Sequence, residues 1–412
     1  MALELDSESL VGMPHLESLQ LGRNNIWTLP ERVFCPLPAL RHLNLTWNRL
    51  QDVSEVGVTG GCGAHLITLD LSGNDLVMLP EAGLAGLESL KELYLQYNEI
   101  SMMADGSLVG LNSLNVLNMS SNRLVALPPE IFNETLALQQ LYLQNNSLSV
   151  LAPGLFSSLT ELTLLDLSHN QLTSEWVTRF LTKLKNLQHL DLSNNVIRTL
   201  CKECLSGLSE VEVLDLSMNE LTAIPHNSFD TNQGLKIMRL DGNKIGDVNA
   251  LFAALPNLMW LNVSDNRITW FDYALIPAQL EYLDLQHNRI TELGNYYTIQ
   301  KELQLKTLDA SHNFIEKLGP TSVPDSIQFI VRFQKVVSKK CGLKLFPPEP
   351  AAIPKEDDKA IIYDAFVSHS DLDAKTLLLF LTIIYIIITT ITITYPNSEV
   401  VPSSTNINSR LP

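Results

Sequence analysis

An eleven-residue frame that recurs along most of the chain is the feature that most constrains its fold. It reads L-x-x-L-x-L-x-x-N-x-L, as in LTLLDLSHNQL at residues 162–172. Successive asparagines of the frame lie 22 to 26 residues apart, and most lie 24 apart. A fixed short period predicts one structural unit repeated along a single axis rather than separate globular domains. The frame asparagines are Asn24, Asn48, Asn74, Asn98, Asn122, Asn146, Asn170, Asn195, Asn219, Asn243, Asn266, Asn288 and Asn313.

The spelling of the frame predicts a short strand followed by a turn. Leu165 and Leu167 alternate with Asp166, so the leucines point inward and the aspartate points outward. Asn170 then falls in a turn at the edge of the core, where its amide can bond backbone groups that would otherwise be buried unpaired. One repeat cannot bury its own leucines, so stacked neighbours must share a continuous core.

The frame resembles the leucine-rich repeat. The resemblance implies an α/β fold: a leucine-rich-repeat solenoid, shaped as a curved horseshoe with a parallel sheet on its concave face. About thirteen repeats of ~24 residues would occupy residues 1–330, followed by a mostly irregular C-terminal tail.

The segments between the strands predict how the convex side is filled. Several carry an L-P-x-x-x-F signature, and we expect its ring, at Phe34, Phe132 and Phe229, to pack in the convex part of the core. Residues 174–187 are the best candidate for a convex helix, because Trp176 and Phe180 would share one helical face.

Charge and cysteine content limit the partners and the chemistry. The formal net charge of −17 argues against nucleic acid and against an anionic membrane surface, and favours a basic protein surface. Cys35, Cys62 and Cys341 are isolated in the sequence. Cys201 and Cys204 form a single C-x-x-C, which lacks the second pair that a zinc site needs. A local disulfide and two free thiols both fit this pair, and we expect no metal, no cofactor and no catalytic residue.

Residues at outward positions of the strands are the candidates for a binding surface. Aspartates recur there and form an acidic stripe, which is either solvated repeat consensus or a site for a basic ligand. Exposed aromatic side chains are common anchors of protein interfaces. The ligand-surface candidates are Trp47, Tyr94, Tyr142, Asp166, Asp191, Asp215, Trp260 and Tyr282.

Five N-x-S/T sequons mark possible sites of N-linked glycosylation. Three of them, Asn44, Asn118 and Asn262, occupy outward strand positions, where a glycan would cover part of the concave face. The other two are Asn133 and Asn145.

The last repeats and the segment after them resemble the Toll family. Residues 269–297 and 305–330, with their DASHN…SVP spelling, are similar to the middle of an arthropod-type Toll ectodomain, and the resemblance covers roughly residues 7–330. After a Pro-rich and charged linker at residues 331–359, residues 360–374 resemble the start of a TIR domain. The box 1 residues are Tyr363, Asp364, Ala365, Phe366, Val367 and Ser368.

The C-terminal part departs from a complete receptor of that family. The TIR resemblance ends after box 1, so we expect no TIR enzyme activity and no signalling by this chain alone. Residues 376–396 are long and apolar enough to be a candidate transmembrane helix, and residues 397–412 are predicted to be disordered. The first residues have neither the basic nor the apolar part of a signal peptide, so the chain is expected to be a truncated or mis-spliced fragment.

The resemblance implies a receptor function that involves no enzymatic step. The repeats would bind an extracellular protein, such as a cystine-knot cytokine, or another leucine-rich-repeat receptor, in innate immune or developmental signalling. TIR adaptors would bind only the full-length parent, a single-pass membrane glycoprotein with extracellular repeats. Two alternatives remain: a leucine-rich-repeat adhesion or guidance protein, and a cytosolic tail-anchored repeat protein, which the lysines before the apolar run favour.

Overall fold

The computed structural model shows a succession of short parallel strands with long connections between them. It describes residues 3–58, 61–175, 184–248, 251–294, 302–316, 323–324, 326–327 and 329–331. These residues belong to one compact unit, residues 1–343. The predicted linker beyond residue 331, the TIR box, the candidate membrane helix and the C-terminal tail all lie outside the described residues.

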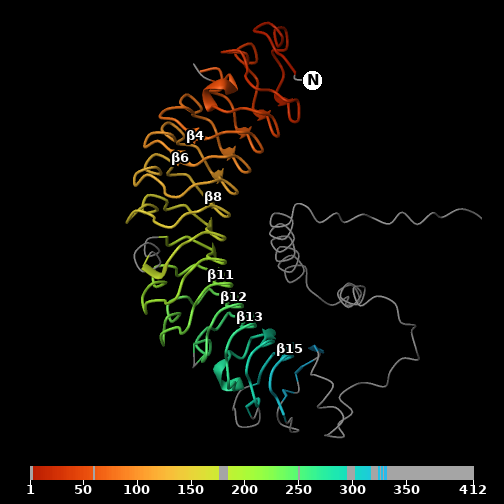
Figure 1. The fold of residues 1–412 in the computed structure, drawn as a ribbon, viewed down its shortest axis with the longest axis vertical. Helices are drawn as coiled ribbons and strands as arrows, with labels where there is room; N and C mark the ends of the chain where they lie inside the picture. The colour runs from red at the N-terminus through yellow and green to blue at the C-terminus, as the bar shows by residue number, and fades with distance from the viewer. Residues whose placement is uncertain are drawn as a thin grey trace, which may run out of the picture. The chain divides into compact units, whose positions relative to one another are not determined.

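Fourteen strands form one parallel sheet in chain order, which confirms the predicted solenoid. The array of repeats is curved, and the strands line its inner, concave side (Figure 1). The strands are β1 (Ser18–Gln20), β2 (His42–Asn44), β3 (Thr68–Asp70), β5 (Glu92–Tyr94), β7 (Val116–Asn118), β8 (Gln140–Tyr142), β9 (Leu164–Asp166), β10 (His189–Asp191), β11 (Val213–Asp215), β12 (Ile237–Arg239), β13 (Trp260–Asn262), β14 (Tyr282–Asp284), β15 (Thr307–Asp309) and β16 (Phe329–Val331).

The last strand is one more than the thirteen asparagines predict. β16 pairs with β15 in parallel, with Phe329 opposite Thr307, although no frame asparagine follows it. A strand in this sheet therefore needs only an extended backbone beside its neighbour, and the full frame is not required.

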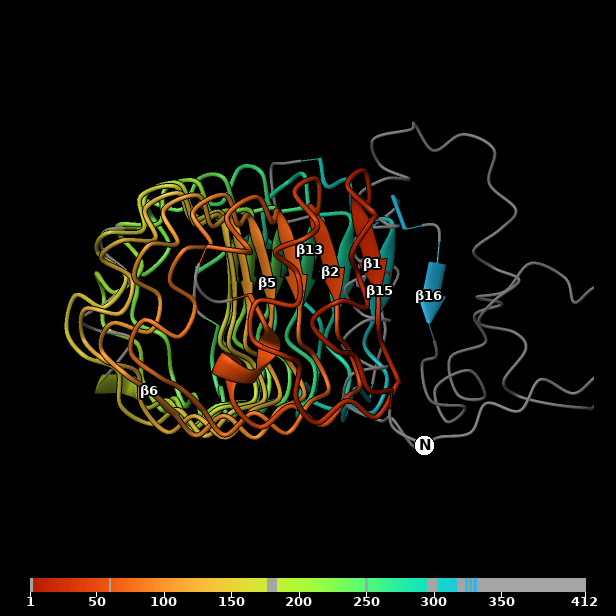
Figure 2. The same ribbon diagram turned by 90° about the horizontal axis from the view of Figure 1, so that it is seen from above.

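The connections return along the opposite side of the coil, mostly as turns. A second, two-stranded sheet, β4 (Met78–Leu79) and β6 (Met102–Met103), lies there, away from the main sheet (Figure 2). The described connections also contain two short 3-10 helices, η1 (Val53–Val56) and η3 (Tyr273–Leu275). Of the predicted convex helix, Ser174 and Glu175 are helical and residues 176–183 lie outside the described residues.

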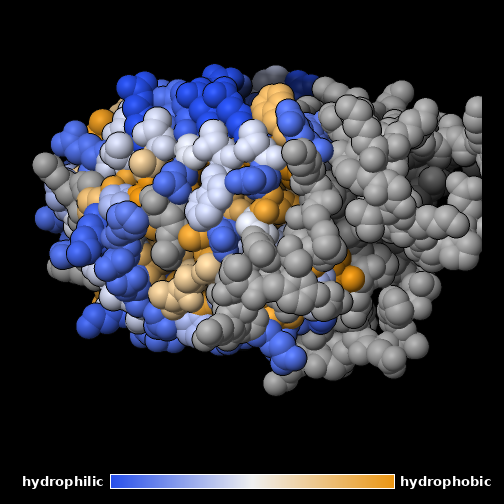
Figure 3. Space-filling view, turned by 90° about the horizontal axis from the view of Figure 1, so that it is seen from below, coloured by the Kyte–Doolittle hydropathy of each residue, from blue (hydrophilic) through white to orange (hydrophobic). Residues whose placement is uncertain are grey.

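The core runs continuously through the stacked repeats. From β2 to β15, the middle residue of each strand of the main sheet is buried, as Leu165 is in β9 and Leu190 in β10. The predicted ring positions Phe34, Phe132 and Phe229 are all fully buried on the convex side. Seen from the C-terminal end, hydrophobic residues lie inside a rim of hydrophilic ones (Figure 3). The coil therefore buries apolar surface mainly by stacking each repeat on the next.

The asparagine ladder joins each repeat to the one before it. Asn170 Nδ2 donates to the carbonyl oxygens of Leu143 (3.0 Å), Leu167 (3.1 Å) and Ser168 (3.0 Å). Its Oδ1 accepts from the backbone N–H of Leu148 at 2.9 Å. The same pattern recurs along the array, so these buried amides satisfy backbone groups at every turn.

A second regularity accompanies the ladder. The residue before each frame asparagine has a positive φ, from +50° at Met218 to +67° at Gly73 and Gly242. The glycines leave room for large neighbours, since Trp47 lies over Gly73 and Met218 lies over Gly242. Trp47 also stacks on Tyr97, with ring centroids 6.0 Å apart.

Among the described residues, two disulfides lie in the connections between strands. Cys201 bonds to Cys204, which selects the local disulfide from the two predicted alternatives. Cys35 bonds to Cys62, 27 residues further on, a pairing that the sequence did not predict. Cys35 lies 13 residues before Asn48 and Cys62 lies 12 residues before Asn74, so the two cysteines occupy nearly equivalent places on neighbouring repeats.

Candidate functional site

The solvent-facing residues of the strands form two columns along the concave sheet. The first and third residues of each strand flank the buried middle residue, and in most strands they are partly exposed. Neighbouring strands are in register, so equivalent residues lie side by side, ~5 Å apart. We call these the first column and the third column.

Acidic residues occupy most of the third column in the second half of the array. Asp166, Asp191, Asp215 and Arg239 are consecutive neighbours in the register from β9 to β12. Asp284 and Asp309 follow on β14 and β15. The structure therefore brings together three predicted site residues, Asp166, Asp191 and Asp215, in one continuous row.

Each of these aspartates also has a local structural role. Asp166 Oδ1 accepts from the backbone N–H of Ser168 at 3.0 Å, and Asp191 and Asp215 make the same bond to Ser193 and Ser217 at 2.8 Å. This bond closes a turn at the end of the strand. Asparagine makes the same bond at Asn44, Asn118 and Asn262, so this hydrogen bond needs the side-chain oxygen of Asp or Asn but no charge.

Burial and mutual repulsion raise the pKa values of the row. Desolvation is the largest cause for Asp166 and for Asp191, and the charge of Asp166 further raises the pKa of Asp191. For Asp215, burial and the charge of Asp191 raise the pKa to about 7. Burial raises the pKa of Asp284 to about 6. The row therefore reaches its full negative charge only in alkaline solution and is partly protonated near neutral pH.

Arg239 is the cation at the end of this row, and the sequence analysis missed it. Its Nη1 lies 3.1 Å from Asp215 Oδ2, and its Nη2 lies 3.1 Å from Asp241 Oδ2. Partial burial opposes its charge, but Asp215 and Asp241 outweigh this and raise its pKa above the ordinary value. The alternation of residues along the strand was enough to place Arg239 in the third column. Its positive charge was not considered because aspartates occupy most equivalent positions.

A mostly apolar first column runs beside the acidic one. It begins with Leu164, His189, Val213 and Ile237, of which His189 is a half-buried polar residue and Ile237 is buried. The column continues with Trp260 and Tyr282, whose rings stack in parallel with centroids 5.1 Å apart. The sequence analysis predicted the two aromatic residues but missed the aliphatic ones. Their position at the strand start was the signal, because it repeats with the same period as the aspartates.

Of the remaining predicted surface residues, Tyr142 adjoins this region, and Tyr94 and Trp47 lie apart from it. Tyr94 and Tyr142 stand in the third column on β5 and β8, with Tyr142 opposite Asp166 in the register. Trp47 is not on the sheet, because it lies in the turn before Asn48, where it is half-exposed. The predicted candidates therefore divide into a concave group and one turn residue.

The sequons differ in their surroundings. Asn44, Asn118 and Asn262 stand at their predicted outward positions in the third column, but they are half-buried there rather than exposed. Asn133 and Asn145 are exposed in connections away from the sheet. Among the described residues, no group of three His, Cys, Asp or Glu side chains could hold a metal ion. In that part of the chain no helix has the length and hydropathy to cross a bilayer.

The stacked parallel coil, with its asparagine ladder and solvent-facing concave sheet, defines a repeat scaffold of the kind that typically binds other molecules without enzymatic chemistry. A family model described as "Leucine rich repeat" matches residues 2–50, 64–124, 113–172, 178–221 and 209–268. These matches cover more than half of the chain, which therefore belongs to the leucine-rich repeat family.

Individual relatives cover only parts of the chain or share the fold at low identity. A stretch of 90 residues is 51% identical to Toll-like receptor 7 of Drosophila melanogaster, which is 22% of this chain and 6% of that protein. The fold is similar to the mouse RP105/MD-1 complex, with 26% identity, a TM-score of 0.60, and coverage of 68% of this chain and 47% of that one. It is also similar to the Drosophila Toll–Spatzle complex, with 22% identity, a TM-score of 0.52, and coverage of 75% and 49%.

Proposed function

We propose that this chain is the recognition part of a Toll-type receptor and binds a protein ligand through the concave face of β9 to β14. The observation that best supports this proposal is that a mostly apolar first column and a mostly acidic third column run along the same strands. A ligand that presents apolar side chains beside Arg or Lys would match both columns. The proposal includes no enzymatic step.

The partner class follows from the relatives. The solved Toll complex contains Spatzle, and the mouse protein RP105 is bound to MD-1, so both relatives bind proteins. For this chain we propose a cystine-knot cytokine of the Spatzle type as the ligand, with a second leucine-rich-repeat receptor as the other candidate. The chain spans less than half of each of these solved chains, so the whole receptor offers further surface.

The remaining features of a Toll receptor are also proposals. Residues 360–374 are the start of a TIR domain, residues 376–396 span a membrane, and the parent receptor exposes its repeats outside the cell. TIR adaptors bind that parent rather than this chain. The residues of the TIR start and of the apolar segment lie outside the described part of the chain. These assignments are therefore supported by the sequence alone.

A binding experiment with matched aromatic variants tests the proposal. The secreted chain is immobilised, and a Spatzle-type cystine-knot dimer or a Toll ectodomain is passed over it. Trp260→Ala should weaken binding by about 2 kcal/mol, or about 30-fold, because it removes half of the stacked pair. Trp270→Ala is the control, since Trp270 is 49% exposed and lies outside the strands.

The charge of the third column provides a second arm of that test. Asp191→Asn keeps the hydrogen-bonding atom that closes the turn, as Asn262 does in its own repeat. It should lower the association rate, most clearly at low salt, because it removes attraction for a basic ligand. Absence of binding to both probes, or equal losses for Trp260→Ala and Trp270→Ala, would remove the concave face of β9 to β14 as the site.

A further inference from the structure

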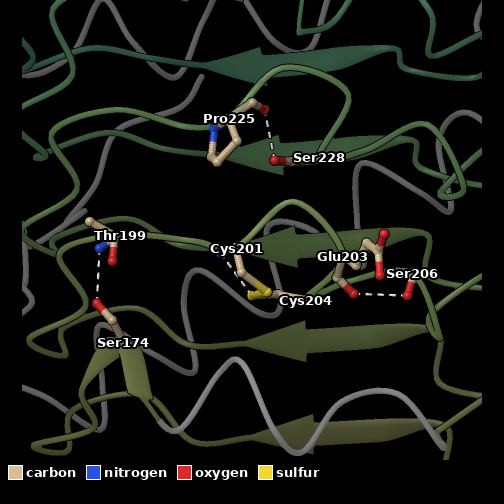
Figure 4. Close-up of a disulfide and its surroundings, with 8 residues drawn as sticks. All are labelled: Ser174, Thr199, Cys201, Glu203, Cys204, Ser206, Pro225 and Ser228. Atoms are coloured by element: carbon tan, nitrogen blue, oxygen red, sulfur yellow. Dashed lines mark hydrogen bonds between the residues drawn. A yellow bond between two sulfur atoms is a disulfide. The ribbon is translucent and has the colours of Figure 1, made fainter.

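The Cys201–Cys204 disulfide lies in a convex turn between β10 and β11, away from the proposed ligand surface (Figure 4). The two cysteines are three residues apart and their Cα atoms are 5.2 Å apart. The bond therefore closes a single turn and ties no distant parts of the chain together. A short loop of this kind contributes little to folding stability compared with a long one.

The turn forms without the disulfide elsewhere in the array. In the next repeat, Pro225 and Ser228 occupy the places of Cys201 and Cys204 (Figure 4). There Ser228 Oγ donates to the carbonyl oxygen of Pro225 at 2.7 Å, and this hydrogen bond takes the place of the disulfide. Both turns contain the same backbone hydrogen bond, from the fourth residue to the first, at 3.3 Å. The fold therefore does not require a covalent bond at this place.

The two sulfur atoms differ in exposure and in hydrogen bonding. Cys204 is 1% exposed and packs in the hydrophobic core, whereas Cys201 is partly exposed at its edge. The backbone N–H of Cys201 donates to Cys204 Sγ at 2.8 Å. A thiolate formed on Cys204 would be stabilised by that donor, and the reduced side chain would still pack as a small apolar group.

We propose that Cys201–Cys204 is an exchangeable disulfide, a thiol-modification site that reacts reversibly with a dithiol while the repeats stay folded. A thiolate of the dithiol attacks Cys201 Sγ and forms a mixed disulfide, and the Cys201–Cys204 bond breaks with Cys204 leaving as a thiolate that takes up a proton. The second thiol of the dithiol then attacks the mixed disulfide and releases Cys201. The pair gains two electrons and two protons, and the dithiol becomes a disulfide.

The chain contains its own reference bond. Cys35–Cys62 joins neighbouring repeats across 27 residues, so it closes a much longer loop. Its rupture should lower folding stability more, because more chain entropy is released in the unfolded state. Comparison of the two bonds in one molecule separates local exchange from general reduction.

Differential alkylation with mass spectrometry, after equilibration in dithiothreitol redox buffers, tests the proposal. Cys201–Cys204 should be half-reduced at a ratio of reduced to oxidised dithiothreitol about tenfold lower than Cys35–Cys62. The double variant Cys201→Ala with Cys204→Ser should keep its thermal unfolding midpoint, and Cys35→Ala with Cys62→Ala should lower it. Reduction of Cys35–Cys62 first, or equal losses of stability in the two double variants, would overturn the proposal.

The direction of attack has a separate test. In Cys204→Ser, the free Cys201 should form a mixed disulfide with oxidised glutathione at least about tenfold faster than Cys204 does in Cys201→Ser, because Cys204 is buried. Cys204→Ser introduces the residue that the next repeat has at this place, Ser228, and Cys201→Ser replaces a thiol with a hydroxyl of similar size. Both variants are therefore expected to fold. Equal rates would show that either sulfur can be attacked and would overturn the assignment of Cys201.

Discussion

Asn170 shows how one side chain can join two repeats. Its amide makes bonds to carbonyl groups of both repeats and accepts an N–H from the earlier one. Asn170→Ala would leave the Leu148 N–H and the Leu143 carbonyl buried without their partner. We expect a loss of about 2–3 kcal/mol in the free energy of unfolding, measured by urea denaturation.

The neighbouring residue supplies the control for that measurement. Gln171 is exposed, so Gln171→Ala should change the free energy of unfolding by less than about 0.5 kcal/mol. A loss for Asn170→Ala no larger than that for Gln171→Ala would show that the asparagine ladder is not a source of stability.

The sequons make a prediction about modification at single residues. Asn133 and Asn145 are exposed away from the sheet, whereas Asn262 lies between Arg239 and Asp284 in the third column. A glycan on Asn262 would cover the proposed ligand surface. We expect glycosidase treatment with mass spectrometry to find glycans on Asn133 and Asn145 of the secreted chain and none on Asn262, and a glycan on Asn262 would contradict the proposed surface.

The row of carboxylates from β9 to β11 makes stability depend on pH. The pKa of Asp191 is raised in the folded chain, so the folded state binds its proton more tightly than the unfolded state does. This contribution to stability is complete below pH ~4, the unfolded pKa of Asp, and is lost as pH rises through the raised folded value. Asp191→Asn should therefore stabilise the protein at pH 8, by about 1–2 kcal/mol, and by less at pH 5.

Calorimetric unfolding at the two pH values measures that difference. Asp75→Asn is the control, because Asp75 is exposed and lies outside the row. An Asp191→Asn variant whose midpoint shifts equally at both pH values would show that repulsion along the row is not the cause.

The strands also show what can be read from the sequence at the scale of elements. Leu165 and Asp166 reveal which side faces the core, because a period of two fixes their directions. The interaction partners of these residues depend on how the repeats stack. No short sequence motif could show that Arg239 lies beside both Asp215 and Asp241, because Asp215 belongs to the preceding repeat. The Cys35–Cys62 bond was missed for the same reason, since it depends on the length of one repeat.

At the scale of the molecule, the array is a one-dimensional stack in which each repeat contacts its neighbours. Leu165 is fully buried, so Leu165→Ala should cost about 3–5 kcal/mol. Hydrogen exchange should show the largest loss of amide protection in β8 to β10 and smaller losses toward β1 and β15. Leu164→Ala is the control, because Leu164 lies on the solvent side of the same strand.

A uniform rise in exchange along the array after Leu165→Ala would instead indicate a single cooperative unit. The sequence predicted the stack itself, since the frame repeats along residues 1–330. The ligand surface was only partly predictable, because it combines residues from six neighbouring strands.

The asparagine ladder has a direction, because each amide bonds backward to the preceding repeat. Every junction along the coil is therefore nearly interchangeable with the next. Deletion of one whole repeat would bring together two repeats whose contact surfaces are already complementary. Duplication of a repeat would extend the coil without a new kind of contact. The length of the array can therefore change by whole repeats. Gain or loss of a repeat would change the distance between two binding surfaces while the fold is kept.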